Sequence, residues 1–380
     1  MDDRAEAWLR RRTSHWRDWP ADRLLGWKQD QGARISVVIP ARDEEATVGD
    51  VVGAVRDEFV LGVPLVDELV VMDSDSADAT GRVAADAGAT VYRCRDVARA
   101  LGAYPGKGEA LWKSLLVTTG DIVVFMDADL TTWGSHFVTG LLGPLLLPPG
   151  EAPPRTPRGV PDTAASRGAP PVPPGGAIAS GTQSSEILLV KACYDRSVGE
   201  RADGGTIGGG RVTELVARPM LNLWWPQLSG VAQPLSGEWA GRRTLLESLP
   251  VPVGYGVEIA VLIDTAQRHG VDAIAQVDLG ERAHTHQSDA DLAVMAAELM
   301  LVAERRRFGA ELTSGPELIQ FTRAGEGVLG TRARAVPSAE RPPASTVAAD
   351  TVLADTVLAD TVLADTVRQP AGGARFGVTR

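Results

Sequence analysis

The chain has 380 residues, 44% of them hydrophobic, which is enough for one large domain or two ordinary domains. A net charge of -11 argues against a nucleic-acid-binding surface, so any anionic ligand must be met by local positive charge. With two cysteines, Cys94 and Cys193, the sequence excludes a disulfide framework and is typical of a reducing compartment.

Residues 1–34 are predicted to form an N-terminal helical segment. Their opening run, MDDRAEAWLRRRTSHW, lacks the apolar block of a signal peptide. No uninterrupted apolar run in the sequence reaches the length of a membrane span. We therefore expect a soluble, cytoplasmic protein.

Residues 35–142 alternate between strand and helix patterns. Short β-branched apolar runs predict strands at 35–40, 68–73, 89–94 and 121–127. Between them, residues 44–59, 76–88 and 106–120 have helical spacing and end near a glycine or a charged turn. This alternation predicts an α/β fold with a largely parallel sheet and helices on both faces. In such sheets the ligand crevice lies beyond the carboxyl ends of the strands.

Acidic residues follow three of these strands. Asp43 comes after the first strand, Asp73 and Asp75 come at the end of the second, and Asp127 and Asp129 come at the end of the fourth. If the strand in VVFMDADLTTW continued that far, Asp127 and Asp129 would project from the same side and repel each other. Either a divalent cation or full exposure to water in a turn would relieve this repulsion, and the residues alone leave both open.

The composition changes in the middle and at the end of the chain. Residues 143–177 are so rich in Pro, Gly and small side chains that we predict a flexible insert. Residues 178–330 carry a glycine cluster, a helix followed by a strand, and an amphipathic helix over 288–308. From 331 to 380 the chain ends in repeats of ADTVL, whose period of five fits neither a heptad nor a strand, so we predict a disordered tail.

Eight motifs between about residues 20 and 310 carry a family resemblance. In chain order they are VVIPARDEE, VVMDSDSADAT, PGKGEALWKSL, DIVVFMDADL, GGGRVTELVARPMLN, QPLSGEWAGRR, GYGVEIAVLID and AIAQVDLGERAH. Together they resemble the actinobacterial glucosyl-3-phosphoglycerate synthases. The resemblance implies a retaining glycosyltransferase of GT-A fold that moves glucose from UDP-glucose to the 2-hydroxyl of 3-phosphoglycerate, a step of methylglucose lipopolysaccharide biosynthesis. It also implies a divalent metal, usually Mg²⁺ with Mn²⁺ or Co²⁺ as alternatives, and we expect a homodimer.

The resemblance divides the acidic and basic residues of the site by role. It implies that Asp129 and His284 bind the metal, although a loop histidine taken alone is more often solvated. It implies that Asp127, Glu258 and Arg282 are catalytic, with Asp127 toward the sugar and ribose. Glu258 by itself could simply complement a helix dipole. We expect the acceptor to attack from the face that the diphosphate leaves, with the departing phosphate taking the acceptor's proton.

The same resemblance implies a donor site built from several separate segments. Arg42 and Asp43 commonly differ in relatives, so only backbone contacts are expected to persist there. Ser74 and Asp75 could otherwise cap a helix, and Lys107 could be an exposed lysine at a helix start. The implied donor-binding residues are Pro40, Ala41, Arg42, Asp43, Glu44, Ser74, Asp75, Lys107, Asp127, Leu235 and Gly237.

The run GGGRVTEL has the chemistry of an acceptor site. Flexible backbone amides, the hydroxyl of Thr213 and the guanidinium of Arg211 are suited to clamping a phosphate or carboxylate. The plainer alternative is a glycine turn before a helix capped by Thr213. The resemblance implies that Gly210, Arg211, Val212 and Thr213 form the acceptor-binding loop, with His286 where relatives have asparagine.

Two other functions remain open. A related mannosyl- or glucosyltransferase with another donor or a glycerate-like acceptor is one, because paired acids indicate a metal and a diphosphate but not the sugar. A noncatalytic nucleotide-sugar-binding protein is the other, with the insert and the tail as its working parts. A nucleotidyltransferase would need a glycine-rich basic signature near the first strand, and PARDEE is not one.

Overall fold

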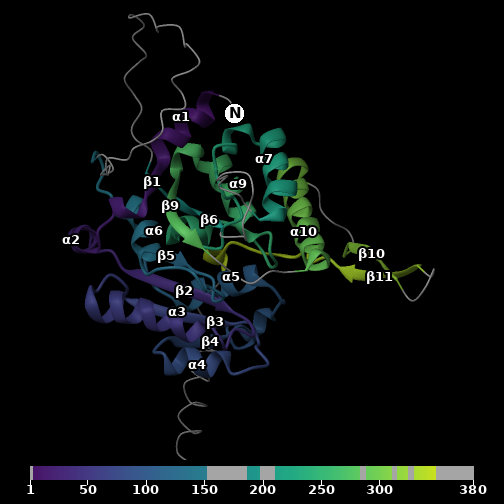
Figure 1. Cartoon of the computed structure of the whole chain (residues 1–380), viewed down its shortest axis with the longest axis horizontal. Coiled ribbons are helices and arrows are strands. Elements are labelled where there is room, and N and C mark those ends of the chain that lie inside the picture. Colours follow the sequence, from purple (N-terminus) through teal and green to yellow (C-terminus); the bar gives the residue numbers. More distant parts are fainter. Residues whose placement is uncertain are drawn as a thin grey trace, which may run out of the picture.

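An eight-stranded sheet is the centre of the computed structural model, which describes residues 3–151, 186–196, 210–282, 288–309, 315–323 and 329–347. The strand order is β1-β9-β6-β7-β5-β2-β3-β4, and β7 runs antiparallel to both of its neighbours while the other pairs are parallel (Figure 1). The strands are β1 (Thr13–His15), β2 (Ile35–Ala41), β3 (Glu68–Asp73), β4 (Thr90–Arg93), β5 (Ile122–Phe125), β6 (Leu189–Arg196), β7 (Trp239–Arg242) and β9 (Ile274–Arg282). The largely parallel sheet predicted from the sequence is confirmed.

Side-chain alternation along β2 divides the hydrophobic residues into two cores. Val37 and Ile39 belong to one core and Val38 belongs to the other, as expected for a strand buried on both faces. The first core packs α2 (Ala21–Gln31), α3 (Val48–Val55), α4 (Thr80–Asp86) and α6 (His136–Leu146) on the sheet. The second packs α1 (Asp3–Arg12), α5 (Lys107–Val117), α7 (Arg218–Trp224), α8 (Arg243–Ser248), α9 (Val257–His269) and α10 (Asp289–Phe308).

Short helical turns join these elements. Two are π-helical, η2 (Arg56–Gly62) and η5 (Thr213–Ala217). The others are η1 (Trp16–Asp18), η3 (Cys94–Asp96), η4 (Arg99–Leu101), η6 (Pro226–Leu228), η7 (Val271–Ala273) and η8 (Ala344–Thr346). None of the described helices is long and apolar enough to cross a membrane.

The N-terminal segment contributes a strand as well as helices. The prediction of an all-helical segment over 1–34 is wrong at β1, which pairs in parallel with Gln276, Val277 and Asp278 of β9. The three residues TSH carry no strand pattern of their own, so pairing with β9 decides their conformation. Upstream, Trp8 Nε1 donates to the carbonyl of Val271 at 2.9 Å, which also holds α1 against the second core.

The predicted insert begins later than the composition suggested. Residues 143–146 form the end of α6, so the boundary at 143 is wrong, and the leucines Leu145 and Leu146 are buried. A Cβ on Gly143 would lie 2.1 Å from the ring of Trp19, so this glycine is required by close packing and does not indicate a loop. Residues 152–185, which contain most of the predicted insert, lie outside the described residues.

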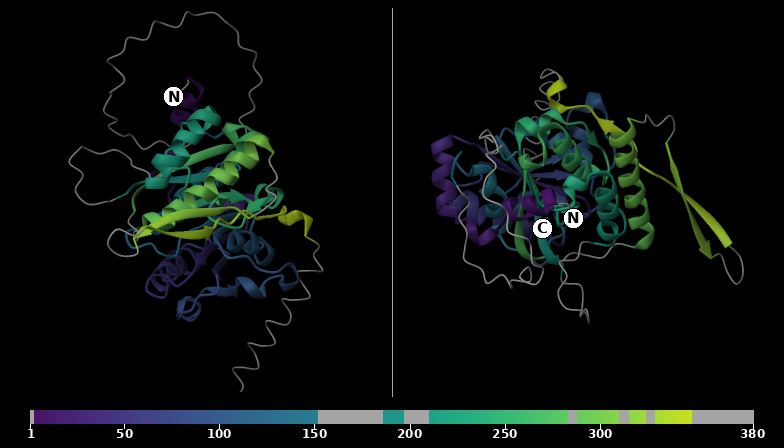
Figure 2. Two further views of the ribbon diagram at one scale, coloured as in Figure 1. Left: turned by 90° about the vertical axis from the view of Figure 1, so that its right-hand side faces the viewer. Right: turned by 90° about the horizontal axis from the view of Figure 1, so that it is seen from above.

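The predicted disordered tail is likewise wrong over residues 331–347. β10 (Glu317–Arg323) and β11 (Leu329–Ala335) form an antiparallel hairpin that projects from the body of the molecule (Figures 1 and 2). The chain then returns, and β12 (Glu340–Arg341) pairs with β8 (Val251–Pro252). The ADTVL repeats lie outside the described residues.

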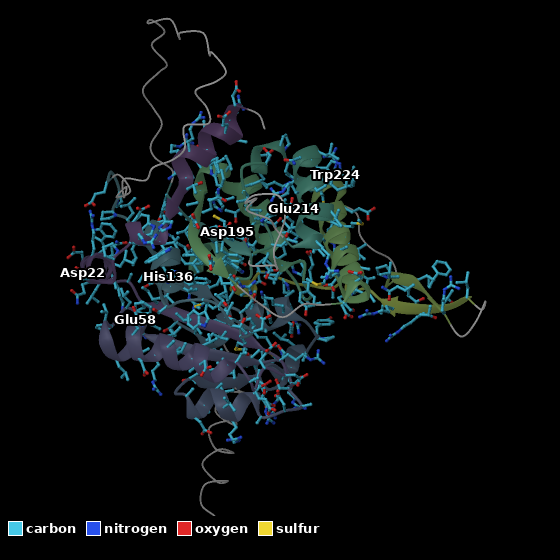
Figure 3. The ribbon with its side chains drawn as sticks, in the orientation of Figure 1. Asp22, Glu58, His136, Asp195, Glu214 and Trp224 are labelled. Atoms are coloured by element: carbon cyan, nitrogen blue, oxygen red, sulfur yellow. The ribbon has the colours of Figure 1, made fainter. Side chains whose placement is uncertain are left out.

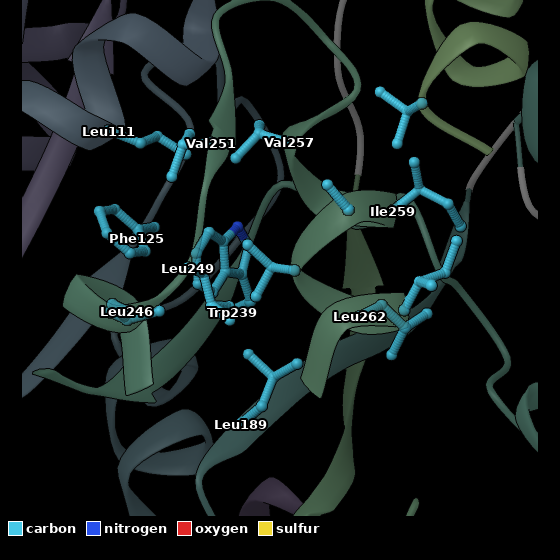
Figure 4. Packing of buried hydrophobic residues seen from close by; sticks show 14 of the residues in the cluster. Leu111, Phe125, Leu189, Trp239, Leu246, Leu249, Val251, Val257, Ile259 and Leu262 are labelled. Carbon is cyan, nitrogen blue, oxygen red and sulfur yellow. The ribbon is translucent and has the colours of Figure 1, made fainter. Parts of the chain in front are cut away.

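A hydrophobic cluster lies directly behind the edge where the acidic residues follow the strands. The rings of Phe125 at the end of β5 and Trp239 at the start of β7 are 4.4 Å apart, and Figure 4 shows leucines and valines around Trp239. His136, labelled in Figure 3, has Nε2 3.0 Å from the carbonyl of Leu279 and so links α6 to β9. These contacts fix the ends of the strands that lead into Asp127 and Arg282.

Candidate active site

A cleft of about 790 Å³ lies where β2, β3, β5 and β9 reach their carboxyl ends. This is the edge at which open α/β sheets bind ligands. Its walls include these predicted residues: Pro40, Ala41, Arg42, Glu44, Ser74, Lys107, Asp127, Asp129, Gly210, Arg211, Val212, Thr213, Leu235, Gly237, Glu258 and Arg282. Most of the described residues predicted to bind donor, acceptor and metal therefore line one cleft.

Asp43 and Asp75 are predicted donor-binding residues that do not line this cleft. Asp43 Oδ1 accepts a hydrogen bond from the amide of Ala77 at 2.7 Å, and Asp75 forms an ion pair with Arg95 at 2.9 Å. Both aspartates have positive φ, 57° and 61°, a backbone conformation that is typical of turns. Asp43 lies in the loop after β2, and Asp75 lies in the loop after β3. The side chain of Asp43 thus joins the loops after β2 and β3, and Asp75 pairs with η3 and does not cap α4, so the donor-binding role of both stays a prediction.

Lys107 is largely enclosed between two carboxylates, with 14% of its side chain exposed. Its Nζ lies 2.6 Å from Oδ1 of Asp127 and 2.8 Å from Oε1 of Glu258. Burial by itself would lower the pKa of Lys107, but Asp127 and Glu258 outweigh it and raise that pKa. The alternative of an exposed lysine at a helix start is thus wrong, and Lys107 joins the start of α5 to the first turn of α9.

Arg282 holds a second group of carboxylates. Its Nη2 lies 2.8 Å from Oδ2 of Asp127, 3.0 Å from Oε1 of Glu238 and 3.6 Å from Oδ1 of Asp129. Burial opposes the charge of Arg282, yet Glu238 and the other neighbours raise its pKa. Arg282 is the last residue of β9, so the strand delivers a fixed cation to the cleft.

The described carboxylates of this cluster outnumber its permanent cations, which fits a divalent metal. Within the described part of the chain, Oδ1 of Asp129 is buried and accepts no hydrogen bond. Burial, and then the charge of Asp127, raise the pKa of Asp129, so a cation would stabilise the ionised form of this carboxylate. His284 and His286 lie outside the described residues, and their predicted roles stay predictions. The described residues contain no group of three or more candidate ligands.

The turn that carries Leu235 and Gly237 lies against Asp127. A Cβ on Gly237 would be 2.0 Å from Oδ2 of Asp127, so only glycine allows this approach. Beneath the turn, buried Lys191 donates to the carbonyl of Ser236 at 2.8 Å, and burial lowers the pKa of Lys191 to about 7. The turn is therefore fixed from the protein interior.

Gly210, Arg211, Val212 and Thr213 also line the cleft. Thr213 is buried and starts the π-helical turn η5, whose first residues have no side-chain cap, so the capping alternative for Thr213 is wrong. Arg211 forms an ion pair with Asp289 at the start of α10, and half of its side chain remains exposed. The guanidinium lies at the cleft wall, where an anionic ligand would compete with Asp289 for it.

One side of the cleft was not expected from the sequence. Tyr255, Leu292, Met295, Glu298 and Leu299 also line it, and the last four lie on α10. Glu298 Oε2 accepts from the amide of Tyr255 at 2.6 Å, and burial raises the pKa of Glu298 to about 7. A glutamate in a charged amphipathic helix gives no sequence signal for such a position, because the pattern is that of a solvated face.

Comparison with known proteins decides the family. A model of glycosyl transferase family 2 matches residues 36–142. The glucosyl-3-phosphoglycerate synthase of Petrotoga mobilis is 40% identical over 331 residues, which are 85% of this chain and 90% of that protein. That of Mycolicibacterium smegmatis is 41% identical over 316 residues, 83% of this chain and 90% of that protein. The chain belongs to the glucosyl-3-phosphoglycerate synthase family.

Solved structures of the glucosyl-3-phosphoglycerate synthase family agree with the fold. The enzyme from Mycobacterium tuberculosis, crystallised with Mn²⁺ and UDP-glucose, matches with a TM-score of 0.67 and 39% identity. The match covers 86% of this chain and 95% of that one. The predicted resemblance and the GT-A glycosyltransferase fold are thereby confirmed.

Proposed function

We propose that the protein transfers glucose from UDP-glucose to the 2-hydroxyl of 3-phosphoglycerate and releases UDP. The observation that carries this proposal is the cleft in which Lys107, Asp127, Asp129 and Arg282 face the loop with Arg211. The Mycobacterium tuberculosis relative has been crystallised with Mn²⁺, UDP-glucose and phosphoglyceric acid, and separately with UDP and glucosyl-3-phosphoglycerate. Family membership makes the same substrates the first candidates here.

Asp129 and His284 would hold a divalent metal, Mg²⁺ or Mn²⁺. When bound, such a metal neutralises the charge that develops on the leaving diphosphate. Arg282 supplies a fixed positive charge beside Asp127, and this charge would also stabilise the leaving diphosphate. Lys107 orients Asp127 and Glu258, since it bonds to one oxygen of each.

We further propose retention of the anomeric configuration by same-face attack. The bond between the anomeric carbon and the diphosphate breaks, the bond to the acceptor's 2-oxygen forms, and the hydroxyl proton passes to a diphosphate oxygen. Glu258 is the carboxylate that a double-displacement route would need as a nucleophile. Its Oε1 is 2.8 Å from the Lys107 ammonium, and such a pairing lowers the nucleophilicity of a carboxylate. This favours the direct route.

Incubating the full chain with UDP-glucose, 3-phosphoglycerate and Mg²⁺ or Mn²⁺ tests the proposal. We expect UDP release that depends on the acceptor and the metal, and a product whose anomeric proton coupling in NMR is that of an α-glucoside. Activity with GDP-mannose or with glycerate in place of these substrates would favour a related transferase. Donor binding without turnover on any acceptor would favour a noncatalytic nucleotide-sugar-binding protein.

A cytoplasmic homodimer is proposed as the working form. The free, buried thiols of Cys94 and Cys193 fit a reducing compartment. The β10–β11 hairpin exposes Ile319, Phe321 and Leu329, which fits burial against a second chain. Sedimentation equilibrium of the purified protein distinguishes a dimer from a monomer.

A further inference from the structure

Arg341 is a buried cation outside the cleft. It contacts the chain on both sides of residues 105–108, which we call the Lys107 loop. It comes from β12, only 7% exposed. Its guanidinium donates at 2.7 Å to each carboxylate oxygen of Glu109, and to the carbonyls of Leu101 at 2.9 Å and Gly102 at 3.0 Å. It also lies over the rings of Tyr104 and Trp112. One side chain thus joins the chain before Lys107 to the chain after it.

The start of α5 rests on β8, the strand that pairs with β12, and on the two residues that follow β8. The amides of Gly108 and Glu109 donate to the carbonyls of Gly254 at 3.1 Å and Val253 at 2.9 Å. A Cβ on Gly108 would lie 1.8 Å from the carbonyl oxygen of Pro252, so the backbones approach as closely as glycine permits. The C-terminal segment, the edge strand β8 and the Lys107 loop therefore form one continuous stack.

We infer that Arg341 is a positioning residue: by clamping the loop, it holds Lys107 between Asp127 and Glu258. This inference rests on the proposed function for its effect on turnover. Glu109 is two residues beyond Lys107 in α5, so a shift of the first turn moves the ammonium directly. Displacements of about 1 Å in a positioning group are enough to cost on the order of 100-fold in rate.

Arg341→Met is the direct test, and Glu340→Gln is its matched control. Glu340 is the neighbouring residue. It forms ion pairs with Arg305 at 3.0 Å and with Arg306, so it ties the same segment to α10 and makes none of these contacts with the Lys107 loop. We expect both variants to lower the melting temperature. We expect only Arg341→Met to lower kcat, by about 10-fold or more, and Arg341→Lys to restore part of that loss. Equal kcat in Arg341→Met and wild type would overturn the inference.

A double-mutant cycle separates positioning from general destabilisation. If Arg341 acts through Lys107, Arg341→Met should lower kcat less than 2-fold when Lys107 is already methionine. If Arg341→Met lowered kcat by the same factor in wild type and in the Lys107→Met variant, the inference would be contradicted. Lys113 also lies 3.4 Å from Glu109, so Arg341→Met leaves that carboxylate one cation. Should Arg341→Met not fold, Arg341→Gln takes its place, because an amide can still donate to the carbonyl of Leu101 or Gly102 and leaves the Lys113–Glu109 pair intact.

A labelling measurement decides the inference without using turnover. Acetylation by an N-hydroxysuccinimide ester, followed by peptide mass spectrometry, reports how accessible Lys107 is. We expect Lys107 to be protected in wild type and in Glu340→Gln, and to react at least several-fold faster in Arg341→Met. Protection in all three variants would overturn the inference. Absence of UDP release from wild type would instead overturn the proposed function, while the labelling result would stand.

Discussion

Charged side chains in the cleft are held in position by oppositely charged neighbours. Glu238 is fully buried, and burial raises its pKa even with Arg282 beside it. Lys107 and Arg282 remain charged only because carboxylates surround them. Removing one partner therefore leaves another buried charge uncompensated, which costs more than the lost contact. Oδ1 of Asp129 accepts no hydrogen bond from the described residues and lies 3.6 Å from Nη2 of Arg282.

Replacing Asp129 should separate metal binding from folding. We expect Asp129→Asn to lose nearly all turnover and to lose the rise in melting temperature that Mn²⁺ gives to wild type. In metal-free buffer its melting temperature should equal or exceed that of wild type, because the amide has no charge to bury. Asp86→Asn, an exposed aspartate of α4, should behave as wild type. A normal Mn²⁺ shift in Asp129→Asn would contradict the assignment.

Arg211 should act on the acceptor and not on the donor. Arg211→Ala should weaken acceptor binding by about 1.5 to 3 kcal/mol, the usual cost of removing a charged hydrogen-bonding partner. Arg211→Lys should recover only part, since it lacks the planar fork. Asp289→Asn should lower the acceptor KM, because the competing carboxylate is gone. Initial rates against 3-phosphoglycerate and calorimetry with UDP-glucose measure both sites. Equal weakening of both would place the loop in the donor site.

Helix α10 closes the cleft and also carries a titrating group. The helix begins with Ser288 as its cap and ends at Gly309, and Leu299, Val302 and Ala303 are buried in the second core. That register turns Glu298 inward, where the amide of Tyr255 is its hydrogen-bond donor. Because α10 packs against both η5 and α9, it connects the part of the cleft wall at Arg211 with the part at Glu258.

Glu298 should make stability depend on pH. Its folded pKa, about 7, is above the ordinary value of 4.5, so the folded state holds the proton more tightly over that interval. The resulting stabilisation is present below the lower value and is lost as pH rises through 7. Glu298→Gln should thus raise the free energy of unfolding relative to wild type at pH 8 by about 1 kcal/mol or more, and much less at pH 5. Urea unfolding at both pH values checks this, with exposed Glu304→Gln as control. A gain that is equal at both pH values would contradict the assignment.

Residues 341–344, near the end of the described chain, pack into the main domain. Arg341 reaches Glu109, and the carbonyl of Pro342 accepts from Trp112 Nε1 at 2.7 Å. Ala344 lies in the second core, which joins the sheet to α5, α8 and α9. The segment after the β10–β11 hairpin is therefore part of the domain.

Truncation at two positions should give opposite results. A chain ending at residue 347 should keep its melting temperature and its UDP release within a few-fold of wild type. A chain ending at residue 335 should melt several degrees lower and lose most activity, because it lacks Arg341 and the acceptor for Trp112. Thermal melting and UDP release are measured on both. Full activity of the shorter chain would show that the C-terminal segment is dispensable.

The sequence by itself determined the strands β2 to β5, the helix α10 and the composition of the site. These follow from local patterns: β-branched runs, helical spacing, and acids placed just after strands. Motif resemblance added the roles of Asp129 and Arg211, which the cleft brings together. Prediction from local patterns failed at two places where packing decides the structure. β1 is a strand because it pairs with β9, and Gly143, which its composition assigned to a loop, packs against Trp19 within a helix.

Only the tertiary structure decided which charges are partners. Lys107 and Glu258, or Arg341 and Glu109, are far apart in sequence and adjacent in space. Glu298 has the sequence context of a solvated helix face and becomes a buried cleft residue through the rotation of α10. The physical reason is that propensity and periodicity act over a few residues, whereas burial and ion pairing depend on how distant segments pack.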